Sequence, residues 1–482
     1  MPTESREADR YMSPFDALLY RGDVEPATRS MLAAACLLDR PPGRRAFIDA
    51  VDRASRLVLR LRQRVVAAPV SVLLPVWAVD PDFDLSYHLR FLRADAPGSF
   101  EQLLGIVQQE VMRPLDQARP LWEMILVEGL AEDRAAVIIK MSHAISDGVG
   151  IVRLFTALFD EQQHPDRGPM PPAPIPEDIT PDDVVERALK RLPRALARTA
   201  LRSSGAALAL ARQASDHSGP SLAELRAYVG SLQRMVKPGA EPSPVLRGRS
   251  LARRCIAFEI PLAQIKQAGQ RLDASVNDVY LAGVIGALRR YHLGLGVAPA
   301  PIPMAIPVNL RSDTDQAAGN RFGVVTLAAP LDVADVARRL AIIKEQVRSG
   351  RKEPAVGAPA ALANAFCRLP DWLRQRLAAQ APKPDVQASN VPGSPVPVYL
   401  AGSRLERVYA FGPVPGVAAM IALQSLAGTC SVAVNLDPAA ITDLDLFMTS
   451  LHEGFAEVLP KTGRGRGFTA PTAGSVETGE SP

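Results

Sequence analysis

The segment Lys140 to Gly150, KMSHAISDGVG, contains residue types that acid–base chemistry requires. His143 follows an apolar run, Ala135 to Met141, whose β-branched residues predict a buried strand. An imidazole with an ordinary pKa of about 6.5 can take a proton from a hydroxyl near neutral pH. Asp147 directly precedes an expected helix, where a carboxylate can cap unpaired backbone N–H groups.

Each of these residues also has a structural interpretation. A single histidine beside an apolar strand is more often a packed core residue, and Asp147 is more often a helix cap or ion-pair partner. Ser142 next to His143 raises the question of a covalent nucleophile. Adjacent strand residues point to opposite faces, and no GxSxG sequence surrounds the serine, so the pattern disfavours a serine hydrolase.

The expected secondary structure around this segment alternates between strands and helices. Helical spacing of apolar residues predicts a helix over Val149 to Phe159 and another over Val276 to Tyr291. Strands are expected near Arg253, from Pro303 to Val308 and from Val324 to Ala328. This alternation predicts a mixed α/β fold.

Composition divides the chain into four parts. Residues 1–164 form an N-terminal lobe; residues 165–250 combine a proline-rich linker (PDRGPMPPAPIPEDITP) with a basic helical segment; residues 251–460 form a C-terminal lobe. Residues 461–482 are rich in Gly, Thr and Ser, and we expect them to be disordered.

The overall composition excludes several classes of protein. With 482 residues, 47% hydrophobic and 22% charged, the chain is neither disordered nor fibrous. Only 5% of residues are aromatic and the net charge is +4, so no nucleic-acid partner is expected. The four cysteines are far apart, which predicts neither a disulfide framework nor a metal site. No signal peptide or membrane-spanning run is apparent, so a cytoplasmic protein with at most peripheral membrane contact is expected.

Six segments carry a resemblance to a known family. KMSHAISDGVG resembles the HHxxxDG motif of the chloramphenicol acetyltransferase-like acyltransferases. With the other five, it makes the chain similar, from about residue 12 to residue 460, to the bacterial wax ester synthase/diacylglycerol acyltransferase family. The other five are MSPFDALLY (Met12–Tyr20), RPLWEMILVEGL (Arg119–Leu130), VNDVYLAGVIGALRRY (Val276–Tyr291), PVNLRSD with GNRFG (Pro307–Gly323) and SNVPGSPVPVYLAG (Ser389–Gly402).

The resemblance implies a fold and a reaction. The fold would have two chloramphenicol acetyltransferase-like lobes with a cleft or tunnel between them. A fatty acyl group would pass from acyl-CoA to the hydroxyl of a diacylglycerol or long-chain alcohol, with no cofactor and no metal. Two rival interpretations stay open: a related acyltransferase with another acceptor, and a catalytically weakened lipid-binding member.

The resemblance also assigns roles to individual residues. His143 would be the general base and Asp147 a structural support, while Gly148 and Asn390 would lie at the substrates. Asn277 would orient a substrate, although helix capping explains an asparagine there equally well. The first motif histidine is replaced by Ser142, which is expected near the substrates and which permits the weakened-member interpretation. Trp122 is expected to be a packing residue.

The basic helical segment suggests a membrane contact. Residues 187–202 place arginines and lysines on one broad face, opposite leucines. Such a helix is most simply a solvated surface helix. It could also bind anionic headgroups at a membrane or lipid-droplet surface, or guide the anionic acyl-CoA.

Overall fold

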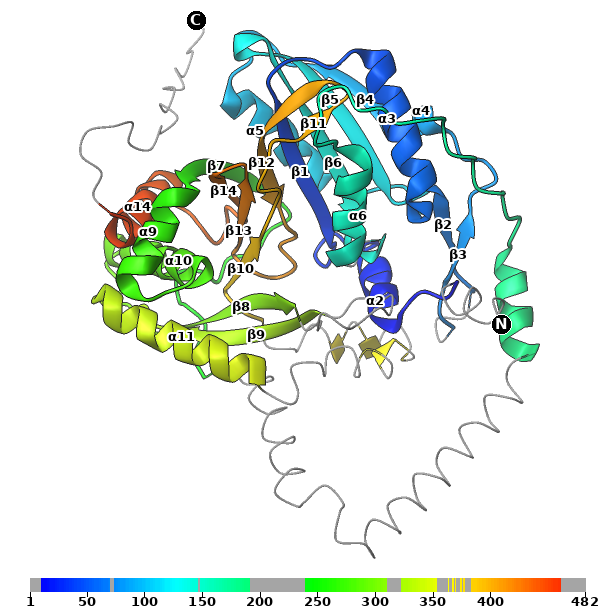
Figure 1. Ribbon diagram of the computed structural model, residues 1–482. Helices are drawn as coiled ribbons and strands as arrows, with labels where there is room; N and C mark the ends of the chain where they lie inside the picture. Colours follow the sequence, from blue (N-terminus) through cyan, green and yellow to red (C-terminus); the bar gives the residue numbers. More distant parts are fainter. Residues whose placement is uncertain are drawn as a thin grey trace, which may run out of the picture.

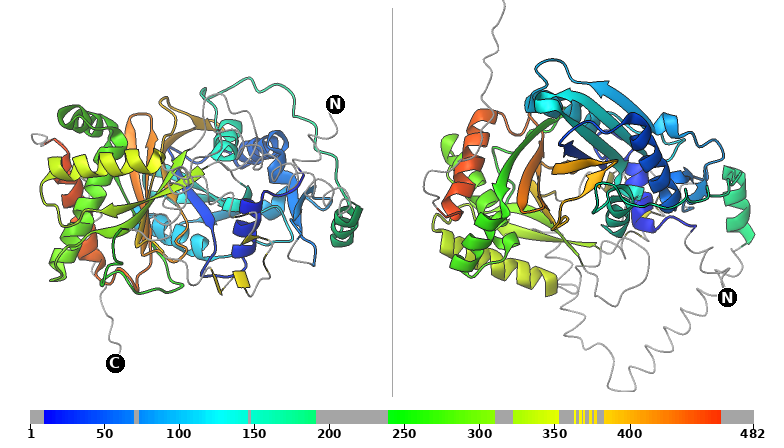
Figure 2. Two further views of the ribbon diagram at one scale, coloured as in Figure 1. Left: turned by 90° about the horizontal axis from the view of Figure 1, so that it is seen from below. Right: turned by 45° about the horizontal axis from the view of Figure 1, so that its top comes forward.

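The computed structural model describes residues 10–69, 73–145, 148–190, 239–309, 322–352 and 383–460, with a few residues between 363 and 377. Two six-stranded sheets, each with its own helices, form two lobes that lie side by side (Figure 1). The two further views in Figure 2 keep the same separation, so it is not an effect of the viewing direction. The expected mixed α/β class is therefore confirmed.

The first sheet has the order β11-β12-β1-β6-β5-β4. Its central strands β1 and β6 are antiparallel, with Met31 opposite Ser142. Alternate residues of β6 face different layers because side chains of a strand alternate between faces. Val137 and Ile139 pack with α3 and α6, whereas Ala136 and Ile138 pack with α5. The bounds are β1 Met31–Leu38, β4 Leu89–Arg93, β5 Trp122–Leu130, β6 Arg134–Ser142, β11 Tyr399–Leu400, β12 Ser403–Phe411, α3 Arg44–Leu57, α5 Phe100–Met112 and α6 Gly148–Leu158.

The second sheet has the order β7-β14-β13-β10-β8-β9. β10 is parallel to β13 and β8, and the other pairs are antiparallel. Residues of α9, α10, α11 and α14 share one hydrophobic core with this sheet. The bounds are β7 Arg254–Pro261, β8 Ile302–Asn309, β9 Phe322–Ala329, β10 Val386–Val391, β13 Ala419–Leu426, β14 Thr429–Leu436, α9 Leu262–Leu272, α10 Val276–Gly294, α11 Val336–Lys352 and α14 Leu444–Val458.

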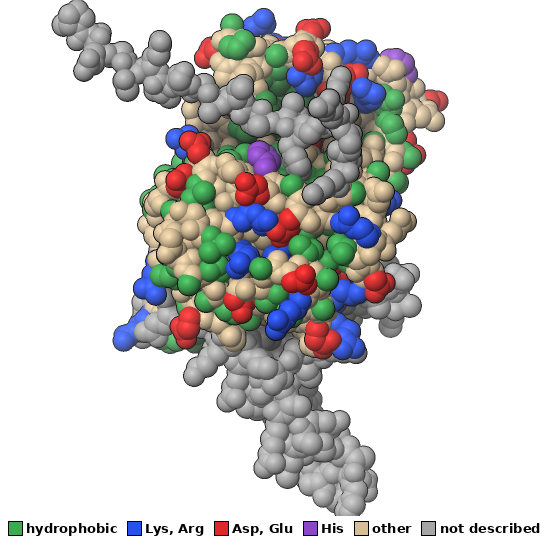
Figure 3. Space-filling view, turned by 90° about the vertical axis from the view of Figure 1, so that its left-hand side faces the viewer, with side chains coloured by type: hydrophobic (Ala, Val, Ile, Leu, Met, Phe, Trp, Pro, Cys, Tyr) green, Lys and Arg blue, Asp and Glu red, His purple; other side chains and the backbone are tan. Residues whose placement is uncertain are grey.

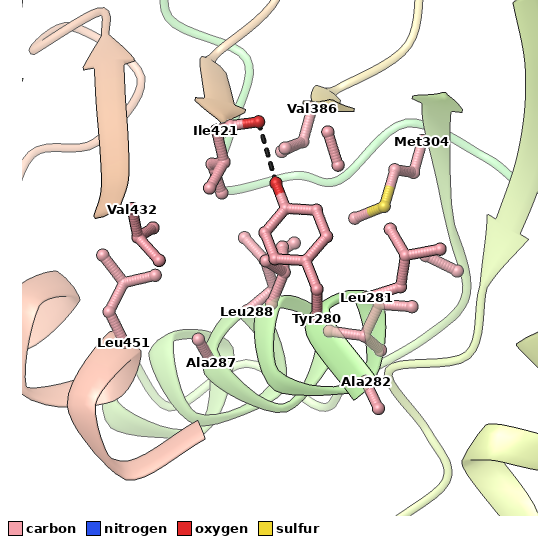
Figure 4. Close-up of a cluster of buried hydrophobic side chains, with 14 of the residues drawn as sticks. Tyr280, Leu281, Ala282, Ala287, Leu288, Met304, Val386, Ile421, Val432 and Leu451 are labelled. Atoms are coloured by element: carbon pink, nitrogen blue, oxygen red, sulfur yellow. Dashed lines mark hydrogen bonds between the residues drawn. The ribbon is translucent and has the colours of Figure 1, made fainter. Parts of the chain in front are cut away.

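Helix α10 is the central element of that core. Tyr280 crosses to the sheet and donates its hydroxyl to the carbonyl oxygen of Ile421 in β13, at 2.8 Å (Figure 4). Gly283 and Gly454 let α10 and α14 approach closely, since a methyl group on Gly454 would lie 2.6 Å from the carbonyl oxygen of Gly283. Small residues at this contact therefore fix how the two helices pack.

The strand pairing departs from a division by sequence alone. β11 and β12 belong to the C-terminal part of the chain, yet β12 pairs with β1 and so extends the first sheet. Backbone pairing of Ala33 with Phe411 ties the two lobes through a shared sheet. The composition of residues 399–411 gives no sign of this exchange, because an antiparallel partner can come from anywhere in the chain.

The proline-rich linker contains neither helix nor strand over residues 165–180, and residues 181–190 are helical. Arg53 of α3 donates to the carbonyl oxygens of Gly168 and Pro169, at 2.7 and 2.9 Å, which holds the linker against the first lobe. Residues 191–238 and 461–482 lie outside the described part, so the rest of the basic helix and the expected disordered tail are not covered by it.

Several smaller elements complete the first lobe. α2 has Ser13 as its N-cap and Pro14 at its first position, both favoured at a helix start. β2 and β3 form a separate two-stranded sheet. The bounds are α2 Pro14–Gly22, η1 Leu59–Arg62, β2 Gln63–Val66, β3 Val76–Val79, α4 Leu85–His88, η2 Ala131–Asp133 and η3 His143–Ile145.

Candidate active site

The turn that carries His143 lies at the end of a central strand. β6 ends at Ser142, η3 begins at His143, and α6 begins at Gly148. The backbone N–H of His143 donates to the carbonyl oxygen of Ser30, just before β1, at 3.0 Å. The imidazole is therefore attached to a backbone that two paired strands hold in place, as the sequence predicted.

The His143 ring is half-buried, and its surroundings favour the neutral form. Burial lowers the pKa of His143 below its ordinary value of 6.5, because it penalises the imidazolium. A hydrogen bond to its own backbone and the nearby Asp23 carboxylate raise the pKa in part. The net shift is downward, so the ring is neutral at pH 7 and can accept a proton. Its Nδ1 atom is buried.

Ser142 is buried and its hydroxyl is fully engaged. Its Oγ donates to Oδ2 of Asp23 at 2.5 Å and accepts from the backbone N–H of Ala144 at 3.1 Å. The hydroxyl hydrogen is thus directed at a carboxylate and not at His143. This bonding agrees with the prediction from strand geometry that Ser142 is not a nucleophile activated by His143.

Asp23, which sequence reasoning missed, is the C-cap residue of α2. Its Oδ1 accepts from the backbone N–H of Ser30 at 2.7 Å and from the Ser30 hydroxyl at 2.9 Å. The Asp23 carboxylate therefore binds Ser142, the residue before His143. It also binds Ser30, whose carbonyl oxygen accepts the backbone N–H of His143. Asp23 and Ser142 are separated by 119 positions, and no local pattern signals such a pair.

The other site residues predicted from the first lobe are only partly described. Gly148 is the first residue of α6, so the predicted change from turn to helix is correct. Asp147 lies outside the described residues, and its predicted supporting role stays a prediction.

Asn277 and Asn390 belong to the second lobe. The N-cap of α10 is Ser275, which forms a capping box with Asp278: Ser275 Oγ accepts from the Asp278 N–H, and the Asp278 carboxylate accepts from the Ser275 N–H. Asn277 is half-buried and is not the cap, so capping does not explain an asparagine at this position. Asn390 is half-buried near the end of β10.

The structure links these two asparagines indirectly. Tyr280, one turn after Asn277, bonds to Ile421 of β13, and Ile421 pairs with Ala388 of β10, two residues before Asn390. Both asparagines thus belong to elements held together by one buried tyrosine. No direct contact between either of them and His143 is seen in the described residues.

Trp122 is a packing residue, as predicted. It is 1% exposed, its Nε1 donates to the carbonyl oxygen of Leu61 at 2.8 Å, and its ring stacks on His88. His88 is buried and its Nδ1 lies 2.8 Å from the Trp122 carbonyl oxygen, which makes it part of the same cluster.

A groove of about 390 Å³ lies at a different place, between α5, β7 and α14. Its lining includes Leu104, Cys255, Met448 and His452, and no residue of the motif turn belongs to it. On the face of the second lobe shown in Figure 3, cationic and anionic side chains are intermixed among the described residues. That face therefore does not form an extended surface of one charge.

The described part of the chain offers neither a metal-binding cluster nor a membrane-spanning helix. It contains no group of three or more His, Cys, Asp or Glu side chains placed to hold a metal ion. None of its helices has the length and apolar composition needed to cross a bilayer.

Comparison with solved structures shows the fold. The wax ester synthase/diacylglycerol acyltransferase from Marinobacter aquaeolei VT8 superposes with a TM-score of 0.60 and 22% identity, over 93% of this chain and 98% of that one. The first condensation domain of the calcium-dependent antibiotic synthetase superposes with a TM-score of 0.56 and 15% identity, over 93% of this chain and 95% of that one. The expected chloramphenicol acetyltransferase-like fold is thus confirmed.

Comparison with sequences shows the family. A Mycobacterium tuberculosis H37Rv protein named "putative diacyglycerol O-acyltransferase" is 41% identical over 463 residues, which cover 95% of this chain and 94% of that protein. The model of the wax ester synthase/diacylglycerol acyltransferase catalytic domain matches residues 12–280, and that of the C-terminal domain matches residues 318–458. The chain therefore belongs to the wax ester synthase/diacylglycerol acyltransferase family and is an acyltransferase.

Proposed function

We propose that the protein transfers a fatty acyl group from acyl-CoA to the hydroxyl of a diacylglycerol or a long-chain alcohol, with His143 as general base. Family membership supports the reaction class, and the named relatives support the lipid acceptor. The observation that carries the role of His143 is its position: a neutral imidazole, half-buried, directly after a rigid central strand.

The proposed reaction is a direct transfer. Nε2 of His143 takes the proton of the acceptor hydroxyl while the oxygen attacks the thioester carbonyl carbon. The new C–O bond forms, the C–S bond breaks, and the departing CoA thiolate takes the proton from the imidazolium. No acyl-enzyme is needed, because placing both substrates beside one base accounts for the acceleration. The engaged Ser142 hydroxyl agrees with a mechanism that uses no serine nucleophile.

We propose that residues of both lobes contact the substrates. Gly148 begins the helix that follows the turn in the first lobe, and Asn277 and Asn390 come from the second. Ser142, predicted from the sequence to lie at the substrates, is buried and bonded to Asp23, so its proposed role is to support the turn. An asparagine amide can donate to the carbonyl oxygen on which negative charge develops during attack. Asn277 is the better candidate, because it is half-buried near a helix start without being the cap. Asp147 keeps its proposed supporting role in the turn.

A second proposal concerns the lipid surface. Residues 181–190 form the blue-green helix at the right-hand edge of Figure 1, on the side of the first lobe away from the second. Leu189 is 62% exposed there, and Arg187 and Lys190 lie on the same helix. Arg187 and Lys190 would bind anionic headgroups at a membrane or lipid droplet, together with Arg191, Arg194 and Arg198, which lie outside the described part. Reversing the charge of these three arginines should weaken sedimentation with anionic vesicles, and unchanged binding would refute this proposal alone.

Thiol release tests the acyl transfer. Purified protein is given acyl-CoA with a fatty alcohol, a diacylglycerol or an amine, and CoA thiol is measured. We expect release with the hydroxyl acceptors and its loss in His143→Ala. A preference for the amine would favour a condensation-like acceptor. Wild-type activity no higher than that of His143→Ala would refute catalysis by this residue and favour the lipid-binding rival.

A further inference from the structure

A single carboxylate holds the chain on both sides of His143. Asp23 accepts from the Ser142 hydroxyl through Oδ2, and from the N–H and hydroxyl of Ser30 through Oδ1. Ser30 in turn accepts the backbone N–H of His143, and the Ser142 oxygen accepts the N–H of Ala144. The backbone N–H groups of His143 and Ala144 therefore bond to Ser30 and Ser142, and both of these serines bond to the Asp23 carboxylate.

The backbone of Asp23 is held on both sides. The Asp23 N–H donates to the carbonyl oxygens of Leu19 and Tyr20, which closes the last turn of α2. Nε of Arg29 donates to the Asp23 carbonyl oxygen at 3.3 Å, and Nη1 of Arg29 donates to that of Met112 at 3.2 Å. Because the backbone of Asp23 is held, its carboxylate can fix the position of the turn that it binds.

Resting on the proposed function, we infer that Asp23 is a positioning residue for His143, acting through Ser142 and Ser30. Ser142 occupies the position of the first histidine in the family motif, and its hydroxyl is bonded to Asp23. A hydroxyl can hold this turn only by giving its hydrogen to a strong acceptor, and the carboxylate supplies one. In this inference the serine is part of an alternative support for the base, and its presence is not a mark of lost activity.

Asp23 also acts on His143 through its charge. Besides Asp23, the ionisable side chains on α2 and before β1 are those of Asp16, Tyr20, Arg21, Glu25 and Arg29. Asp16 accepts from the Ser13 hydroxyl, and Arg21 donates to the carbonyl oxygens of Leu73 and Cys367. On β6, Lys140 pairs with Glu110. Loss of the Asp23 charge should therefore lower the pKa of His143 further, because this carboxylate favours the imidazolium.

The first experiment compares Asp23→Asn with a matched control in the second lobe. Asp437 accepts from the N–H and hydroxyl of Ser250 at 2.6 and 2.7 Å, so its carboxylate has the same kind of role far from His143. We expect Asp23→Asn to lower kcat about 10- to 100-fold with little change in KM for acyl-CoA. Asp437→Asn removes a carboxylate of the same kind and should leave kcat per folded molecule unchanged. Equal kcat in the wild type and Asp23→Asn would overturn the inference.

The second experiment tests whether Asp23 acts through the serine. Ser142→Ala alone and together with Asp23→Asn form a double-mutant cycle. We expect the double variant to lose little more kcat than the worse single variant, because both changes break one path. Fully additive losses would show that Asp23 and Ser142 act independently.

A readout without activity separates this inference from the proposed function. The His143 imidazole can be titrated by NMR in the wild type, in Asp23→Asn and in Asp437→Asn. Its signal is assigned by its absence from the spectrum of His143→Gln. We expect a lower His143 pKa in Asp23→Asn than in the wild type, and an unchanged value in Asp437→Asn. This shift is expected even if acyl transfer does not depend on His143. An unchanged pKa in Asp23→Asn would overturn the electrostatic role.

Discussion

The end of the first sheet and the helix layer of the second lobe are stabilised in different ways. Behind the motif turn, buried Lys140 and Glu110 form an ion pair, and buried Ser142 bonds to Asp23. Around α10 the buried surface is mostly apolar, although it also holds the Tyr280 hydroxyl, His292 bonded to Ser243, and the ion pair of Arg339 with Glu457. Directional bonds fix the orientation of a few groups, whereas close packing fixes the distance between whole elements.

The difference predicts that activity and stability can be changed separately. Variants at the motif turn should alter the rate and leave the core intact. Variants between α10 and α14 should lower the free energy of unfolding and leave the rate per folded molecule unchanged. The changes below test that separation.

The largest effect is expected at His143. His143→Gln should lower kcat/KM about 10²- to 10⁴-fold, the usual contribution of a general base, with little change in Tm. Because burial lowers the pKa of His143 below 6.5, the wild-type kcat/KM should fall on the acidic side and reach half of its maximum at a pH below 6.5. A pH–rate profile and thermal unfolding measure both. A half-maximum above pH 6.5 would contradict the lowered pKa.

The next effect concerns the buried charges beside the motif strand. Glu110 is 3% exposed and contacts Arg90, Arg113 and Lys140 at 2.8, 3.1 and 3.7 Å. Glu110→Gln should cost about 3 kcal/mol, because it removes one of the two carboxylates, with Glu123, that offset the buried ammonium of Lys140. Denaturant unfolding measures the loss. The double variant Glu110→Gln/Lys140→Met should recover part of it, and failure to recover would mean that Lys140 does not depend on Glu110.

The same pair predicts a dependence on pH. Burial raises the pKa of Glu110, but Arg90, Lys140 and Arg113 lower it more, so its net value lies below 4.5. A depressed carboxyl pKa contributes stability above the unfolded-state pKa, and that contribution disappears as pH falls through the folded-state value. The difference in unfolding free energy between wild type and Glu110→Gln should therefore shrink below pH 4.5. A difference that stays constant would contradict this linkage.

A smaller loss is expected between the two helices of the second lobe. Gly454→Ala places a methyl group against the backbone of α10 and should cost about 1–3 kcal/mol. Gly105→Ala, at an exposed position of α5 with nothing within 4 Å of the added methyl, should instead gain about 0.5–1 kcal/mol. Differential scanning calorimetry and kcat per folded molecule are the measurements. A Gly454→Ala protein of normal Tm but low activity would break the proposed separation.

The smallest effect concerns the buried hydroxyl of α10. Tyr280→Phe removes the donor to Ile421 and should cost about 1 kcal/mol, since a buried acceptor loses its partner. Tyr87 is 44% exposed and bonds to Asp116 at the surface, so Tyr87→Phe should be close to neutral. Equal unfolding midpoints for the two variants would show that the Tyr280 bond adds nothing.

Much of the local structure could be predicted from the sequence. The strand before His143, the helix after Gly148 and the long helix from Val276 have periodic apolar residues, and their boundaries agree with the structure to within a few residues. The family motifs placed His143 at the head of the turn, where the structure has it. These features are local, so neighbouring residues are enough to specify them.

The support of the base could not be predicted in this way. Asp23 follows a helix with no motif of its own, and Lys140 reads as one charge in an apolar strand. Their partners lie in other elements and become neighbours only when the sheet forms. The order of β11 and β12 beside β1 has the same origin.

The sequence by itself determined the family, the alternation of strands and helices, and which imidazole stands at the end of the motif strand. Only the tertiary structure decided that a serine in place of the first motif histidine is bound to a distant carboxylate, and that strands from late in the chain extend the first sheet. The physical reason is that periodicity and capping are local properties of a chain, whereas hydrogen bonds between distant residues depend on the packing that brings them together.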